Sequence, residues 1–150
     1  MAKLHEYPVT VNWEGGREGK GAVTDEKAHL TTALATPPEF GGSGAGTNPE
    51  QLLAMSVASC YTITFGIIAA NRKLPVSGIK TEATGEVEEN GPSFTYKKVT
   101  IRPQITLAGA DDTQLKLAEE MAHKADSYCI ITNAIRDKVT IVVEPTILNH

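Results

Sequence analysis

Two cysteines are the residues of this chain best suited to chemistry, because a thiolate is both a strong nucleophile and a metal ligand. Cys60 lies in the middle of a long apolar stretch, and Cys129 lies towards the end of the chain. They do not form the Cys-x-x-Cys pair typical of general thiol oxidoreductases, so reduction of protein disulfides is the less favoured activity. A cysteine is also a small buried hydrophobe in many proteins, and a structural role for both stays open.

Two charged residues stand where they could support a thiolate. Arg17 lies in the glycine-rich turn 15–19, where a guanidinium has no structural task, and Glu50 opens the apolar stretch that carries Cys60. Each also has a simpler interpretation. Arg17 is then a solvated hairpin residue, and Glu50 is a carboxylate that complements the positive end of a helix dipole.

Other kinds of site fail on spacing. The segment GGSGAGTNPE matches neither a dinucleotide fingerprint nor a P-loop, and Ser43 lacks the glycines of a nucleophile elbow. A zinc site built from Cys60, His123 and Cys129 has no fourth ligand at a recognisable spacing. We therefore expect no metal site, and neither a dinucleotide site nor a P-loop.

The composition is typical of a globular protein and argues against nucleic-acid binding. It has 150 residues, of which 41% are hydrophobic and 21% are charged, and its formal net charge is −4. A chain with this charge has no basic field to hold a phosphate backbone. The length predicts one domain, residues 1–150. The first residues, MAKLHEYPV, contain no apolar signal region, and we expect a cytoplasmic protein.

The uncharged run 51–71 could be taken for a membrane span, since as a helix it would measure roughly 30 Å. It contains eight polar or weakly polar residues, however, and strand-like segments surround it. We expect instead a central helix that protein covers on nearly every side. One chain of this length covers so long a helix poorly, which indicates that a second chain helps, and we expect no membrane contact.

The elements that must position these residues follow from periodicity and from turn residues. The pattern is typical of an α+β fold, because strands occur in runs rather than alternating with helices. Asn48-Pro49-Glu50 is a helix start, with Thr47 or Asn48 as the cap, and Asn90-Gly91-Pro92 predicts a tight hairpin turn. We predict strands at residues 7–14, 21–24, 29–35, 78–89, 93–107 and 138–143, helices at 49–73 and from 111 or 112, a loop at 36–48 and a short helical turn after residue 129.

Several segments taken together resemble the organic hydroperoxide resistance and osmotically inducible (Ohr/OsmC) family. They are the turn GGREG at 15–19, FGG at 40–42, GTNPEQL at 46–52, ASCY at 58–61 and, more loosely, ADSYC at 125–129. The first half is closer to the organic hydroperoxide resistance branch. The best-known peroxidases of the family usually carry Pro and then Ser after the second cysteine, where this chain has Ile130-Ile131-Thr132-Asn133.

The resemblance implies a cysteine-based peroxidase that reduces alkyl or fatty acyl hydroperoxides to alcohols without a cofactor. Cys60 would be the peroxidatic cysteine and Cys129 the resolving cysteine, joined in a disulfide after turnover. Arg17 would activate the thiolate, and Glu50 would hold the guanidinium. The implied fold is OsmC-like, an intertwined homodimer with antiparallel sheets wrapped around long central helices. The implied reductant is a dithiol or a lipoylated protein.

A second function remains open on the residues alone. The apolar interface could bind a lipid-like ligand in a protein that is not an enzyme, with both cysteines as inert packing. Replacing Cys60 by serine would then leave ligand binding unchanged. Loss of peroxide turnover in the same variant would indicate the enzyme.

Overall fold

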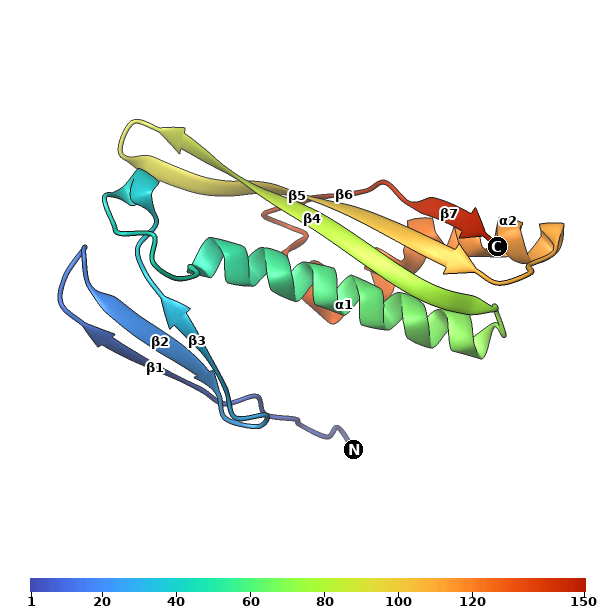
Figure 1. Ribbon diagram of the computed structural model, residues 1–150, viewed down its shortest axis with the longest axis horizontal. Helices are drawn as coiled ribbons and strands as arrows, with labels where there is room; N and C mark the ends of the chain where they lie inside the picture. Colours follow the sequence, from blue (N-terminus) through green and yellow to red (C-terminus); the bar gives the residue numbers. More distant parts are fainter. The chain divides into compact units, whose positions relative to one another are not determined.

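The computed structural model describes residues 1–150 and separates into two compact units, Met1–Leu52 and Leu53–His150. Each unit is built around its own sheet (Figure 1). The α+β class expected from the sequence is confirmed, with strands grouped in runs before and after the long helix. The prediction of a single domain over residues 1–150 stays a prediction.

The first unit is a three-stranded antiparallel sheet in the order β1-β2-β3. Its strands are β1 (Val9–Glu14), β2 (Lys20–Asp25) and β3 (Leu30–Leu34). The alternation that predicted β1 places Val9, Val11 and Trp13 on one face, and all three side chains are exposed. Val11 pairs with Val23 of β2, so the apolar face continues across the sheet.

The loop that follows β3 is held by backbone hydrogen bonds. It includes a short 3-10 helix, η1 (Pro38–Phe40), and then returns alongside the end of β3. The N–H of Ala35 donates to the carbonyl of Thr47 at 3.0 Å, and the N–H of Thr47 donates to the carbonyl of Ala33 at 2.9 Å. This return brings the chain to the start of the long helix.

The long helix is α1 (Pro49–Asn71), and its start agrees with the prediction. The side chain of Asn48 accepts a hydrogen bond from the N–H of Gln51 at 2.9 Å, so Asn48 is the cap. The helix ends two residues before the predicted Lys73, because Lys73 adopts a left-handed conformation with φ 55°. The N–H of Leu74 then bonds back to the carbonyl of Ala69, which closes the helix end. The length and composition of α1 are those of a helix that could cross a membrane. The core helices of soluble proteins often have the same length and composition.

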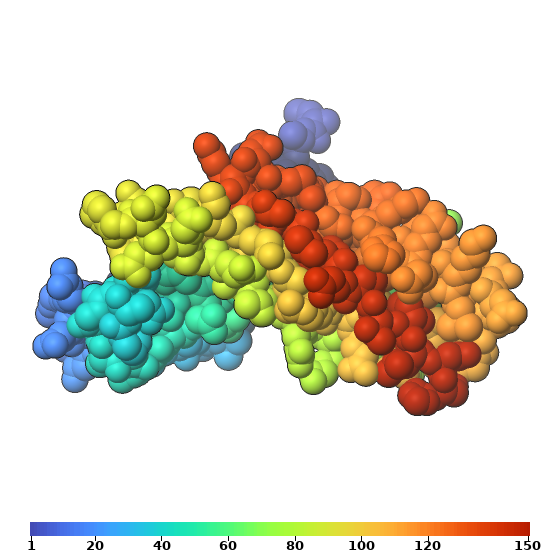
Figure 2. All heavy atoms as spheres, turned by 90° about the horizontal axis from the view of Figure 1, so that it is seen from above, coloured from blue at the N-terminus to red at the C-terminus, as the bar shows by residue number.

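The second unit contains a mixed sheet built on a long hairpin. Strands β4 (Val76–Asn90) and β5 (Ser93–Leu107) pair antiparallel around the predicted turn, in which Gly91 has φ 60°. Strands β6 (Thr140–Val143) and β7 (Thr146–Asn149) pair parallel with successive halves of β5. Figure 2 shows this C-terminal segment in red, crossing one face beside the orange residues of the second helix.

One strand in this sheet was not predicted. The sequence predicted a last strand at 138–143, but β6 begins at Thr140 and β7 follows it after Glu144 and Pro145. Both strands keep one register against β5, and the break falls where Glu144-Pro145 stands opposite Arg102-Pro103. Proline cannot donate to a ladder, so the pairing is interrupted there and a short second strand resumes beyond it. The expectation of antiparallel sheets holds for β1–β3 and for the hairpin, whereas β6 and β7 are parallel to β5.

The remaining helices close the core of the second unit. They are α2 (Asp112–Lys124), η2 (Ala125–Tyr128) and α3 (Ile130–Ile135). Asp111 caps α2 and forms a reciprocal capping box with Gln114. The buried side of α1 packs with β5 and α2 in one hydrophobic cluster, whose largest members are Val57, Tyr61, Phe65, Ile101, Ile105 and Leu107.

Candidate active site: two thiols and a glycine-walled hollow

Cys60 lies midway along α1 and is half-buried. Its neighbours along the helix, Val57 and Tyr61, are fully buried and fix the side of α1 that faces the core. One turn further on, the hydroxyl of Thr64 lies 4.0 Å from the Cys60 sulfur. The thiol therefore sits at the edge of the core, where a small molecule can reach it.

Cys129 lies in the bend between η2 and α3 and is completely buried. Its backbone is extended, and its sulfur accepts a hydrogen bond from the N–H of Thr132 at 3.5 Å. Its own N–H donates to the carbonyl of Asp126 at 3.2 Å. The residue is thus the cap of α3, and the short helical turn predicted after it is confirmed.

The two thiols lie close enough for each to shift the pKa of the other. Burial raises the pKa of Cys60, but the Cys129 thiol and the backbone N–H groups of Ile131 and Ile130 outweigh it, and the pKa is lowered overall. The pKa of Cys129 is raised, first by burial and then by its hydrogen bond to Cys60. The two shifts have opposite signs, so Cys60 ionises more readily than Cys129.

Arg17 belongs to the first unit, in the turn between β1 and β2. Gly15 has φ 93°, and the N–H of Gly19 closes the turn on the carbonyl of Gly16 at 2.9 Å. The Arg17 side chain passes close to Gly41, where an added Cβ would lie 3.0 Å from the arginine Cδ. A larger residue there would push the arginine side chain aside by a few tenths of an ångström, and Gly41 also has a φ of 82° that favours glycine.

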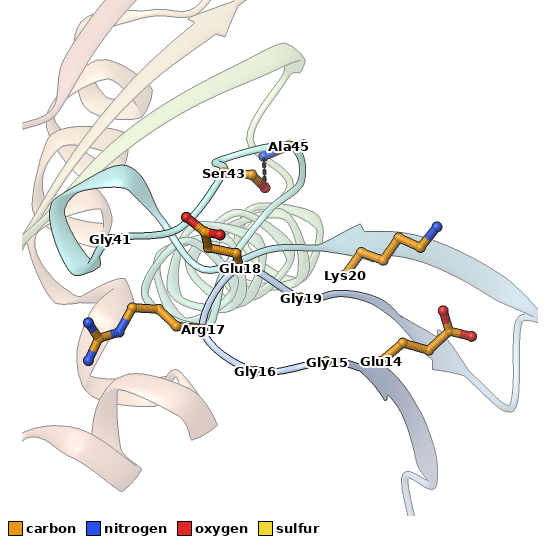
Figure 3. A pocket seen from close by; sticks show the side chains of 10 residues that line it. All are labelled: Glu14, Gly15, Gly16, Arg17, Glu18, Gly19, Lys20, Gly41, Ser43 and Ala45. Carbon is orange, nitrogen blue, oxygen red and sulfur yellow. Dashed lines mark hydrogen bonds between the residues drawn. The ribbon is translucent and has the colours of Figure 1, made fainter.

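An open hollow of about 1000 Å³ surrounds this turn. Figure 3 shows the Arg17 side chain extending to one side of the turn and those of Glu14 and Lys20 to the other. Across the hollow, the hydroxyl of Ser43 accepts a hydrogen bond from the N–H of Ala45 at 3.3 Å. The lining residues are Glu14, Gly15, Gly16, Arg17, Glu18, Gly19, Lys20, Gly41, Ser43 and Ala45.

Glu50 lies in the first turn of α1, with one carboxylate oxygen buried. Its place at the helix start agrees with the sequence, and a carboxylate there complements the helix dipole. Arg17 and Glu50 fall in the first unit, and the two cysteines fall in the second. The expected pairing of Glu50 with Arg17 stays a prediction.

Sequence reasoning missed several groups that act on the thiols. Thr64 and Thr132 follow their cysteines at helical spacing, which is the signal that could have found them. The N–H groups of Ile130 and Ile131 carry no side-chain signal at all. No group of three or more His, Cys, Asp or Glu side chains is placed to hold a metal ion.

Comparisons with known proteins agree with this fold and with the resemblance found in the sequence. The OsmC-like protein family matches residues 41–144. The chain is 33% identical over 144 residues to the uncharacterized protein YmaD of Bacillus subtilis, with 95% of each chain covered. It is 33% identical over 139 residues to the organic hydroperoxide resistance protein of Xanthomonas axonopodis pv. citri, which covers 91% of this chain and 92% of that one.

A solved structure gives the same result. The crystal structure of an organic hydroperoxide resistance protein OsmC from Legionella pneumophila superposes with a TM-score of 0.75 at 26% identity, and the match covers 95% of this chain and 99% of that one. The OsmC-like fold expected from the resemblance is therefore confirmed. This chain belongs to the OsmC-like protein family.

Proposed function

We propose that this protein is a thiol-dependent peroxidase that reduces organic hydroperoxides to alcohols. The observation that carries the proposal is the closeness of a Cys60 thiol of lowered pKa to a buried Cys129 thiol of raised pKa. A peroxidase of this type needs one thiol ionised for attack and a second thiol ready to resolve the product. The name of the Xanthomonas relative, an organic hydroperoxide resistance protein, supports the same activity.

In the first step, the Cys60 thiolate attacks the hydroperoxide oxygen that is remote from the alkyl group. The O–O bond breaks, the alkoxide leaves and takes up a proton to become the alcohol, and Cys60 becomes a sulfenic acid. In the second step, the Cys129 sulfur attacks the sulfenic sulfur. The Cys60–Cys129 disulfide forms, and the sulfenic oxygen leaves as water with the thiol proton.

Ionisation of the thiol alone does not explain efficient turnover. A free cysteine of pKa about 8.5 is a few per cent thiolate at pH 7, so full ionisation gains at most roughly thirtyfold. A thiolate of lower pKa is also a weaker nucleophile. We therefore assign Arg17 to the charge that develops on the departing alkoxide, and Glu50 to holding the guanidinium in place.

The substrate is proposed to be an apolar hydroperoxide, such as an alkyl or fatty acyl one. The residues around Cys60 on α1 are apolar on most sides, including Leu53, Val57, Ile63 and Ile67. Such a wall favours an alkyl chain over hydrogen peroxide. A dithiol, such as one carried on a lipoylated protein of the cytoplasm, would reduce the disulfide again.

The proposed enzyme is a homodimer. On the side of α1 opposite the core, Met55, Ile63 and Ile67 are 53%, 64% and 58% exposed. Only 28% of the most apolar part of α1 is buried within the chain. The apolar face of the first sheet, with Val9, Val11 and Trp13, is exposed as well. In a homodimer, each copy would cover the two apolar surfaces of the other. This would explain why a single chain leaves so much apolar area exposed to water.

The experiment that tests the activity is turnover of cumene hydroperoxide with dihydrolipoamide, and then with dithiothreitol, as reductant. We expect turnover by the wild type and none by Cys60→Ser. Ser59→Ala is the matched control, because Ser59 is the preceding residue of the same helix and is exposed. An inactive wild type, or a Cys60→Ser variant as active as the wild type, would contradict the proposal. Retained binding of an apolar ligand by that inactive protein would indicate the alternative function of a binding protein.

A further inference from the structure

The bend that carries Cys129 is held closed by one arginine. The guanidinium of Arg136, just after α3, reaches back to η2, where Nη1 lies 3.2 Å from the Asp126 carboxylate. Nη2 donates to the backbone carbonyl of the same Asp126 at 3.0 Å. Nε and Nη2 also donate to the side-chain oxygen of Asn133, at 3.4 and 3.3 Å. The arginine therefore ties the residues before Cys129 to those after it.

Two further side chains cross the bend in the same way. The hydroxyl of Thr132 donates to the carbonyl of Asp126 at 2.5 Å, and the side-chain amide of Asn133 donates to the carbonyl of Ser127 at 2.9 Å. Apart from the bonds between Arg136 and Asn133, each of these bonds joins η2 to α3 or to the residue after it, with Cys129 in the bend between them. We call this set, Asp126, Thr132, Asn133 and Arg136, the clasp.

The clasp is more than an isolated surface ion pair. The Asp126 side chain is only 14% exposed, whereas that of Arg136 is 40% exposed. An exposed pair alone contributes little, but planar, multidentate arginine contacts to a mostly buried partner fix geometry. The group whose geometry they fix is the backbone on both sides of Cys129.

We infer that Arg136 is a positioning residue, which holds Cys129 in reach of Cys60 and so favours formation of the disulfide between them. This inference deepens the proposed function and rests on it for its biological meaning. Disulfide formation needs Cα atoms less than about 7 Å apart and aligned Cβ vectors, so small movements of the bend have large effects. Without the guanidinium, the residues around Cys129 gain freedom, and the two sulfurs meet less often.

The first test needs no peroxide. The reduced protein is equilibrated with mixtures of oxidised and reduced dithiothreitol, which convert the two thiols into a disulfide and report their effective concentration. We expect Arg136→Met to lower the equilibrium constant by about three- to tenfold. Arg136→Lys keeps the charge but can bind only one partner well. Its equilibrium constant should lie between those of Arg136→Met and the wild type.

Arg102→Met is the matched control, because Arg102 of β5 also forms an exposed ion pair, at 3.3 Å to Glu144, but lies outside the clasp. It should keep the wild-type constant. Equal constants for Arg136→Met and the wild type, or equal losses in both methionine variants, would overturn the inference. Far-UV circular dichroism and the thermal midpoint identify a variant that fails to fold. In that case Asp126→Asn, which removes the same ion pair at similar volume, replaces it.

The second test uses one equivalent of cumene hydroperoxide with dimedone, which captures sulfenic acid before the disulfide forms. Arg136→Met should give more dimedone adduct on Cys60 and less disulfide than the wild type, at an unchanged rate of peroxide consumption. No adduct or disulfide in the wild type would refute the proposed peroxidase, while the dithiothreitol result would still decide the role of Arg136. An unchanged ratio of adduct to disulfide would count against the positioning role.

Discussion

The hydroxyl of Tyr61 donates a hydrogen bond to the backbone carbonyl of Ala122 at 2.5 Å. Both residues are fully buried, and the bond joins α1, one residue beyond Cys60, to the end of α2. The chain runs from α2 directly into η2 and Cys129. This bond therefore joins the two segments that carry the thiols.

Tyr61→Phe should destabilise the protein by about 1–2 kcal/mol, since a buried carbonyl loses its donor. Urea denaturation measures the change, and Tyr128→Phe is the control, because Tyr128 is exposed.

Burial and, secondarily, the charge of Asp126 raise the pKa of Tyr61. The stability from this group is therefore fully present below the ordinary tyrosine pKa of about 10 and is lost as the pH rises above it. Above that pH, the free energy of unfolding should fall less steeply with pH in Tyr61→Phe than in the wild type. Equal slopes in the two proteins would contradict the assignment.

The Cys129 thiol should be a main reason why the pKa of Cys60 is low. Cys129→Ala removes the donor, so the pKa of Cys60 should rise, whereas Cys129→Ser keeps a hydroxyl donor and should preserve more of the lowering. The rate of iodoacetamide alkylation of Cys60 as a function of pH measures both. If the alkylation rate of Cys60 depended on pH in the same way in the alanine and serine variants, the hydrogen bond from residue 129 would have no part in the ionisation of Cys60.

Ile130 stands where the best-known peroxidases of the family carry proline, and its N–H is one of the donors that lower the pKa of Cys60. Ile130→Pro removes that N–H and suits the first position of α3. The pKa of Cys60 should therefore rise, by less than in Cys129→Ala, because the Ile130 N–H is the weaker donor. Ile130→Val keeps the N–H and serves as control. An unchanged alkylation profile in the proline variant would show that the donor is dispensable.

Arg17→Met should lower turnover of cumene hydroperoxide by about 10²- to 10³-fold, the usual effect of removing a group that stabilises a developing oxyanion. Arg17→Lys should recover part of the rate, since it restores charge without the planar fork. Lys20→Met is the control, because Lys20 lines the same hollow and is also a cation. A comparable loss in Lys20→Met would indicate a general effect of positive charge.

Ile63→Glu should convert the proposed dimer into a monomer, because it places a charge in the middle of the exposed apolar face of α1. Light scattering after size-exclusion chromatography measures the mass of each form. Leu4→Glu is the control, since Leu4 is exposed but lies outside α1 and the first sheet. A monomeric wild type at micromolar concentration would exclude the proposed assembly.

The sequence predicted those parts of the molecule whose cause is local. The hairpin was found because alternation is strong on both sides of Asn90-Gly91-Pro92, and the start of α1 because Asn48, Pro49 and Glu50 each favour a helix N-terminus. Strand β7 was missed because four residues after Pro145 carry too little pattern, and only pairing with β5 makes them a strand.

The site was predictable only in part, for a related reason. Residue types and the family resemblance pointed to Cys60 and Cys129, and the structure brings these two together. The clasp uses backbone carbonyls of Asp126 and Ser127 as acceptors, and every residue has a carbonyl, so no residue type marks them. The roles of Arg17 and Glu50 stay predictions from the resemblance.

The break between β6 and β7 has a consequence for solubility. These strands form one edge of the second sheet, and a long uninterrupted edge offers a template on which another chain can add a strand and start an aggregate. Here the edge is cut into two pieces of four residues each, with Pro145 and an Arg102–Glu144 ion pair at the cut. The break thus leaves this edge in two short pieces beside the fifteen-residue β5, whereas the opposite edge of the sheet is the fifteen-residue β4.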